Sequence, residues 1–207
     1  MSKVKIKKQS TFIDMTAMSD VTVLLLTFFM LTANFIEKEP VQVMTPASVS
    51  EIKIPENYVM TILIDPKGRV FLNLDKPEDK RKVLEEVAKY YKLPEFTPKQ
   101  TKSFVDQTSI GVSVRVMHEF LNMPMDEQDK QLKQSNGIPT DTILGPNNQL
   151  AVWIEKAKEV NPELTIAIKA DQNTPYPLVK KVFSTLQDLK ENRYSLVTTL
   201  KKMPAGL

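Results

Sequence analysis

The sequence predicts an α+β protein with a single N-terminal transmembrane helix, an extended linker and a small mixed α/β domain that contains a β-hairpin and two or more helices. Three observations support this fold class. One apolar segment, residues 16–36, is long enough to cross a bilayer. The next segment, residues 37–57, contains three prolines. From residue 58 to residue 207, stretches with the period of a strand alternate with amphipathic stretches of helical period.

The apolar segment has about the 20 residues that a helix needs to cross a hydrocarbon core of ~30 Å. Four lysines lie within the first eight residues, whereas residues 37–39 are Glu-Lys-Glu. Because lysines near a span favour the cytoplasmic side, we expect residues 1–15 to be a cytoplasmic leader and the domain to be exported. A cleaved signal peptide is the alternative, but its apolar core would have to contain Asp20.

Asp20 is the only charged residue of the apolar segment. An aspartate at the centre of a spanning helix costs roughly 2.5–3.5 kcal/mol, so such residues often face protein or water and carry protons or ions. At ~100° per residue, Thr16, Thr27 and Asn34 lie within about 40° of Asp20. We therefore predict that Asp20 faces a protein interior or a watery path, where such residues often carry protons or ions, and that the other three line its path or contact a neighbouring helix. Alternatively, Thr27 and Asn34 make only ordinary backbone or interhelical hydrogen bonds.

Residues 37–57 predict an extended tether that contains an edge strand, because prolines interrupt short alternations such as Val-Gln-Val-Met at residues 41–44. An alternating segment with unpaired backbone groups is suited to strand addition on a partner. Val41 and Val43 are accordingly candidate effector contacts. The alternative is a passive linker.

The domain begins with a predicted β-hairpin. Residues 58–64 and 69–74 are rich in β-branched and aromatic residues, and they flank the turn sequence Asp-Pro-Lys-Gly at residues 65–68. A helix is predicted at residues 77–91, because proline and two acidic residues occupy its first turn. Its expected apolar face comprises Val83, Leu84, Val87, Tyr90 and Tyr91.

The C-terminal part predicts a helix at residues 149–160, a strand at 164–170, a helix at 176–192 and a final strand at 195–200. The first helix directs Leu150, Trp153, Ile154 and Ala157 inward. The second directs inward Val179, Val182, Phe183, Leu186 and Leu189.

Two separated stretches resemble the ExbD/TolR family of biopolymer transport proteins. Residues 12–32 read FIDMTAMSDVTVLLLTFFMLT, which is similar to the membrane motif of that family, with Ala17 where the family usually has proline. Residues 165–176 read TIAIKADQNTPY, which resembles a second signature in which a strand ends in Arg/Lys-Ala-Asp and is followed by a loop, a tyrosine and a helix.

The resemblance implies an ExbD-like motor subunit of the bacterial inner membrane. In the family, a homodimer of single helices sits inside a ring of ExbB-like channel subunits and uses the proton-motive force to drive a TonB-like effector in the periplasm. The proton-carrying position of the family motif falls on Asp20. Lys169 and Asp171 become candidate effector contacts, although Asp171 also suits a capping role at a strand-to-helix junction.

Other functions stay open at this stage. A TolR-like subunit that serves envelope integrity is a close variant, and a membrane-tethered periplasmic scaffold without ion coupling is a different class. The resemblance also implies that residues 93–148 are an insertion, since the compact family domain has no counterpart. Within it we expect a strand turning into a helix at 109–123, an exposed polar segment at 126–134 and a loop at 137–147.

Composition gives little support to an enzyme. The chain has no cysteine, and its only histidine, His118, lies in an apolar stretch where a packed role is the expectation. No glycine-rich phosphate loop or metal-ligand motif occurs, so we expect no cofactor and no bound metal. A net charge of +3 argues against a nucleic-acid partner. Two acidic groups, at residues 85–86 and 126–129, are interpreted as solvated charge.

Overall fold

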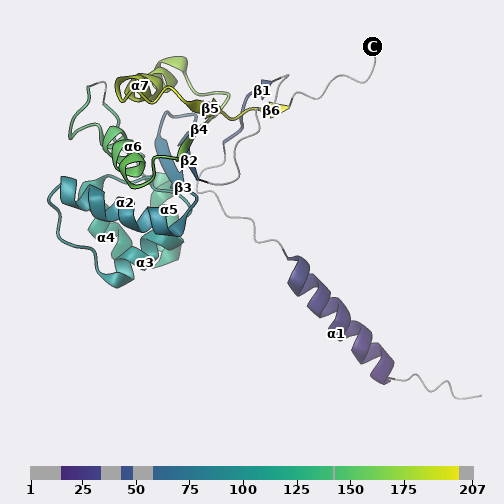
Figure 1. Cartoon of the computed structure of the whole chain (residues 1–207). Helices are drawn as coiled ribbons and strands as arrows, with labels where there is room; N and C mark the ends of the chain where they lie inside the picture. The colour runs from purple at the N-terminus through teal and green to yellow at the C-terminus, as the bar shows by residue number, and fades with distance from the viewer. Residues whose placement is uncertain (1–14, 34–42, 49–57, 142, 201–207) are drawn as a thin grey trace, which may run out of the picture. The chain divides into compact units, whose positions relative to one another are not determined.

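The computed structural model describes residues 15–33, 43–48, 58–141 and 143–200 (Figure 1). The chain divides into two units, residues 1–37 and 38–207. Helix α1 (Met15–Thr32) is the described element of the first unit, and none of its side chains is buried. It is apolar enough to cross a membrane and, with 18 residues, about 27 Å long. The last residues of the predicted span, 34–36, lie outside the described residues.

A four-stranded sheet in the order β3-β2-β4-β5 forms the centre of the second unit. The β2–β3 pair is antiparallel and confirms the predicted hairpin, whereas β2–β4 and β4–β5 are parallel. The strands are β2 (Val59–Ile64), β3 (Val70–Leu74), β4 (Thr165–Ala170) and β5 (Tyr194–Leu196). A separate parallel pair joins β1 (Ala47–Ser48) to β6 (Thr199–Leu200). The predicted final strand is therefore divided between β5 and β6.

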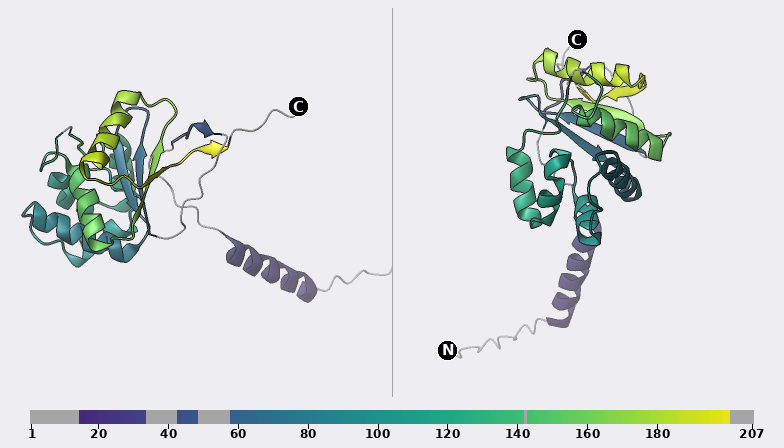
Figure 2. Two further views of the ribbon diagram at one scale, coloured as in Figure 1. Left: turned by 45° about the horizontal axis from the view of Figure 1, so that its top comes forward. Right: turned by 90° about the vertical axis from the view of Figure 1, so that its left-hand side faces the viewer.

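Three helices cover one face of the sheet (Figure 2): α2 (Pro77–Tyr90), α6 (Gln149–Val160) and α7 (Tyr176–Asp188). Their apolar faces form one core with alternate residues of β2, β3 and β4. Trp153 of α6 is completely buried in this core and stacks on Phe104, with ring centroids 5.9 Å apart.

Two boundary predictions for these helices were wrong. Tyr90, predicted to face inward, is 41% exposed, because α2 ends there and only Tyr91 packs against the core. Helix α7 ends at Asp188 rather than residue 192, since Lys190 adopts a positive φ of 61° that helical geometry does not allow.

The hairpin turn is held by the carboxylate of Asp65. Its Oδ1 accepts hydrogen bonds from the backbone N–H groups of Lys67 (3.0 Å) and Arg69 (2.8 Å), and its Oδ2 lies 2.6 Å from Arg69 Nε. The guanidinium of Arg69 also donates from Nη1 to the carbonyl oxygens of Lys133 (2.7 Å) and Ser135 (2.9 Å). Arg69 therefore joins the hairpin to the segment predicted as an insertion.

This segment, residues 93–148, folds as a small helical layer beside β3. It contains α3 (Pro98–Asp106), η1 (Val114–Val116), α4 (Met117–Asn122) and α5 (Met125–Gln134). Ile110 exchanges two backbone hydrogen bonds with Leu72 of β3, at 2.7 and 2.9 Å, and Ile138 donates to the carbonyl of Val70 at 2.8 Å. The outer edge of β3 is therefore covered, which protects it from unwanted strand pairing.

The predictions within residues 93–148 were only partly right. Helix α3 was not predicted. Residues 109–123 contain a single β-bridge at Ile110 instead of a strand, followed by the expected helix. The segment predicted to be exposed, residues 126–134, belongs to α5 and buries Gln128 and Leu132. Gln128 can be buried because its side-chain amide has three hydrogen-bond partners. Its Nε2 donates to the hydroxyl of Ser103 and to the carbonyl of Met123, and its Oε1 accepts from the side-chain amide of Gln107.

Residues 111 and 132 also cover part of the second face of the sheet. Phe71 points away from the main core, yet only 1% of its surface is exposed. A Cβ at Gly111 would overlap the Phe71 ring, so the backbone approach there requires glycine. Leu132 of α5 packs against the same place.

We predict that Arg69→Lys lowers the free energy of unfolding by about 1–3 kcal/mol, because a lysine cannot pair with buried Asp65 and also donate to two carbonyl groups. Guanidinium unfolding of the purified protein, followed by Trp153 fluorescence, measures the change. Lys89→Ala is the control, since its pair with Glu86 is exposed to solvent and should contribute little to the free energy of unfolding. Equal effects of the two substitutions would contradict the assigned role of Arg69.

Candidate functional site

Helix α1 carries three of the predicted site residues, Thr16, Asp20 and Thr27, and all three are exposed to the surroundings of the helix. Among the described residues, the Asp20 carboxylate has no hydrogen bond or ion pair. Thr27 donates from its hydroxyl to the carbonyl of Leu24 at 2.9 Å, as ordinary threonines of membrane helices do. Asn34 lies outside the described residues.

The chemistry of α1 follows from the isolation of this carboxylate. Asp20 is the only ionisable side chain of the helix, and the other residues of α1 are uncharged and mostly apolar. In a bilayer the charged form requires a partner or water, whereas the protonated form does not. Protonation of Asp20 therefore changes which contacts α1 can make with a neighbouring helix.

A second constellation holds the tether to the domain, and we call it the tether clamp: Met44, Asp171 and Gln172. The backbone N–H of Met44 donates to Asp171 Oδ2 at 2.8 Å, and the N–H of Gln172 donates to the carbonyl of Met44, also at 2.8 Å. Both bonds use the backbone of residue 44, whose side chain is 69% exposed. The clamp therefore recognises extended backbone rather than a particular side chain.

The other predicted effector contacts lie around the clamp. Val43 is half-buried and directly precedes Met44, and Lys169 is half-buried in β4, two residues before Asp171. Val41 lies outside the described residues. The structure thus brings Val43 close to Asp171. Asp171 itself is 7% exposed.

The pKa of the Asp171 carboxyl lies below its ordinary value. The main cause is the hydrogen bond from the backbone N–H of Asn173, at 2.9 Å, and the bond from Met44 adds to it. Desolvation by burial acts in the opposite direction. The ionised form is consequently the one that holds the loop and the tether.

No pattern in the sequence predicted the roles of Met44 and Gln172, because both residues act through backbone groups. Arg69 was also not predicted, although the Asp-Pro-Lys-Gly turn places its N–H within reach of Asp65. An ordinary preference of aspartate for turns indicated the junction role of Asp171 but not its tether partner.

Within the part of the chain that the structure describes, there are one candidate membrane-spanning helix, a tether segment and a small α+β domain. Residues 7–201 match the family model described as biopolymer transport protein ExbD/TolR. The chain belongs to this ExbD/TolR family. No curated protein and no solved structure gave a significant match.

We predict that Asp171→Asn destabilises the domain at neutral pH, because asparagine replaces one acceptor oxygen by an N–H₂ donor. Since the folded pKa is lowered, the ionised carboxylate stabilises the fold fully above its unfolded pKa of about 3.9, and this contribution is lost as the pH falls through the folded pKa. Urea unfolding at pH 7 and pH 3 should therefore show a difference from wild type that shrinks at pH 3.

Asp188→Asn is the control for this pH dependence, because Asp188 is exposed at the end of α7. It should behave as wild type at both pH values. A destabilisation by Asp171→Asn of the same size at pH 7 and pH 3 would show that the charge of Asp171 is not what matters.

Proposed function

We propose that this chain is the proton-motive-force-driven motor subunit of an ExbB–ExbD type complex, which energises a TonB-like effector for transport across the outer membrane. The observation that carries the proposal is Asp20, the single ionisable group on a helix apolar enough to cross a membrane. Membership of the ExbD/TolR family supports it, because biopolymer transport is the function that the family description states.

In the proposed mechanism, Asp20 takes up a proton from the periplasmic side and releases it to the cytoplasmic side. Charged Asp20 is stable at a wet or hydrogen-bonding contact and protonated Asp20 at a dry one, so each proton transfer changes the preferred contact of α1. One charge moving through 100 mV releases about 2.3 kcal/mol, which is enough to exchange a few hydrogen bonds. Thr16, Thr27 and Asn34 contribute hydroxyl and amide groups to the same face.

The remainder of the proton path comes from other chains. Among the described residues of α1 no second ionisable group could pass the proton on. We therefore propose that the face of Asp20 contacts a second copy of the chain and the channel ring of ExbB-like subunits. Residues 1–15 are cytoplasmic in this arrangement, and the domain is periplasmic.

In the proposed mechanism, the motion of α1 is passed on to the effector through the tether and the domain. Val41, Val43 and Lys169 are proposed to contact the effector, and Asp171 contributes by holding Met44 next to them. A Tol-linked subunit would use the same α1 chemistry for envelope integrity, so the choice between the two systems depends on the effector that the tether meets.

We predict that Asp20→Asn leaves membrane insertion, dimerisation and ring assembly intact but abolishes proton-driven output. Asparagine keeps the size and polarity of the side chain but cannot bind and release a proton. Output is measured in a deletion strain as energy-dependent uptake across the outer membrane and, in parallel, as resistance to detergent, which separates the TonB-linked from the Tol-linked system. Assembly is checked by co-purification with the ring.

Asp129→Asn is the matched control, because this exposed aspartate of α5 makes the same change of charge outside the membrane. Asp129→Asn should retain full output, and Asp20→Glu should retain part of it. Full activity of Asp20→Asn would remove the motor hypothesis and favour a tethered scaffold.

The absence of native cysteine allows a direct test of topology. We predict that Asp129→Cys reacts with a membrane-impermeant maleimide in cells with a permeabilised outer membrane, whereas Ser2→Cys reacts only after the inner membrane is opened. The reason is the lysine-rich leader, which favours a cytoplasmic N-terminus. The reverse pattern of labelling would invert the proposed direction of proton flow.

A further inference from the structure

The segment that joins the helical layer of residues 93–148 to β3 contains the only Asn-Gly pair of the chain, at Asn136 and Gly137. Asn136 is exposed, and its side-chain amide makes no hydrogen bond or ion pair within the described part of the chain. Gly137 is buried against the edge of β3. The pair therefore combines a free side-chain amide with a backbone that packs closely on the sheet.

Packing on β3 requires glycine at residue 137. Its φ is +75°, in the left-handed region that residues with a side chain rarely adopt. A Cβ atom there would also lie 2.7 Å from the backbone nitrogen and 2.8 Å from the carbonyl oxygen of Val70. The fold thus places an unhindered glycine nitrogen directly after Asn136, and a bulkier residue does not fit in its place.

The backbone N–H of Gly137 is only weakly held. Its acceptor within the described residues is the hydroxyl oxygen of Ser135 at 3.4 Å, beyond the usual range of about 2.7–3.2 Å for an N–H···O bond. The Ser135 hydroxyl donates its own hydrogen to the carbonyl of Leu132, at 2.8 Å. Little hydrogen bonding therefore has to be given up before the glycine nitrogen can react with the amide carbon of Asn136.

We propose that Asn136 is a site of spontaneous deamidation. The deprotonated nitrogen of Gly137 attacks Cγ of Asn136, a C–N bond forms, and the side-chain nitrogen takes up a proton and leaves as ammonia. Water then opens the five-membered succinimide ring. Opening at Cγ gives aspartate. Opening at the backbone carbonyl carbon gives isoaspartate, whose main chain runs through the side-chain carbons and is longer by one carbon atom.

The isoaspartate product releases residues 135–138 from β3. Before the Asn-Gly pair, the carbonyl of Ser135 accepts from Arg69 Nη1 at 2.9 Å, and after it the N–H of Ile138 donates to the carbonyl of Val70 at 2.8 Å. One further carbon lengthens the main chain by roughly 1.5 Å. Because N–H···O bonds vary by only about 0.5 Å in length, both bonds cannot be kept. The cover over the outer edge of β3 therefore loosens as the protein ages.

The aspartate product keeps the original main chain. Its new carboxylate lies one residue from the carbonyl that the Arg69 guanidinium binds, so the added charge is close to a cation. Asn136→Asp thus introduces the charge without the extra carbon and separates the effects of the two products. The modification goes beyond the proposed motor function and does not depend on Asp20, because it lies wholly within the second unit of the chain.

The first measurement follows the modification. Full-length protein in nanodiscs is incubated at mildly alkaline pH, and protein isoaspartyl methyltransferase with labelled S-adenosylmethionine marks isoaspartate in its proteolytic peptides. The peptide that contains residue 136 should gain label at least threefold faster than the peptide that contains residue 192. Asn136→Gln should remove this label, because glutamine would have to close a six-membered ring, which forms much more slowly.

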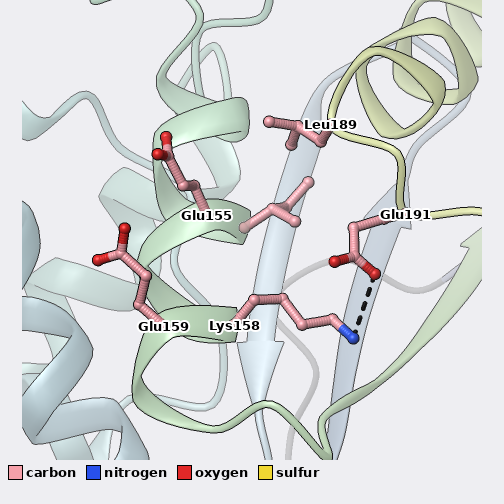
Figure 3. Close-up of a pocket in the computed structure, with 6 residues that line it drawn as sticks. Glu155, Lys158, Glu159, Leu189 and Glu191 are labelled. Atoms are coloured by element: carbon pink, nitrogen blue, oxygen red, sulfur yellow. Dashed lines mark ion pairs between the residues drawn. The ribbon is translucent and has the colours of Figure 1, made fainter.

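Asn192 is the matched control within the same molecule. It is exposed, and among the residues that the structure describes its side chain has no hydrogen-bond or ion-pair partner. It directly follows Glu191, which pairs with Lys158 at 3.2 Å (Figure 3). The residue after it is Arg193, whose side chain hinders attack by the backbone nitrogen.

The second measurement follows the consequence. In hydrogen-exchange mass spectrometry, the N–H of Ile138 should exchange at least tenfold faster in the isoaspartate form than in fresh protein. Treatment with the methyltransferase and unlabelled S-adenosylmethionine, which converts isoaspartate to aspartate, should restore slow exchange. Asn136→Asp should exchange as slowly as wild type.

Equal labelling at residues 136 and 192 would overturn the proposal, since it would show that the fold protects Asn136. Unchanged exchange of Ile138 in the isoaspartate form would also contradict it, because residues 135–138 would then accommodate the longer main chain. Asp20→Asn should accumulate isoaspartate at the wild-type rate, which separates this proposal from the proposed motor function.

Discussion

The parallel pairing of β2 with β4 is the interaction on which the rest of the domain depends. Six successive residues of the two strands pair, from Val59 with Thr165 to Ile64 with Ala170, so both strands end at the same edge of the sheet. Each is followed by an aspartate. Asp65 holds Arg69 and, through it, the segment of residues 93–148, while Asp171 holds the tether at Met44. The tether and the segment of residues 93–148 are therefore both held at the carboxyl ends of β2 and β4. At this end of the sheet the backbone N–H of Asp171 also donates to the carbonyl of Ile64, at 3.0 Å.

The connection from β2 to its parallel partner β4 returns first through β3, which is antiparallel to β2, and then continues through α2 and α6. Helices α2 and α6 pack side by side on one face of the sheet, and residues 93–148 lie between them in the chain. The segment leaves after α2 and returns before α6, so it extends the helical layer and the β3 edge without interrupting the strands.

The predictions from sequence succeeded where the pattern was local and apolar. Alternation around Asp65-Pro66-Lys67-Gly68 predicted the hairpin, and the spacing of Leu150, Trp153 and Ile154 predicted α6. They failed where burial depends on hydrogen bonds, as in α5, whose buried residue Gln128 is polar. At the candidate site, the cost of a lone charge points to Asp20, which stays a prediction, whereas the clamp on Met44 uses backbone groups and leaves no pattern.

Infrared difference spectroscopy of the complex in vesicles can detect whether Asp20 binds and releases protons in the assembled motor. When a pH gradient is imposed, a protonated-carboxyl band should appear and disappear with the direction of the gradient, and the band should be missing in Asp20→Asn. Because Asp20 is the only carboxyl group of α1, the assignment is unambiguous for this helix. A band that is unchanged in Asp20→Asn, or no gradient-dependent band in the wild type, would show that Asp20 does not bind and release protons in the motor.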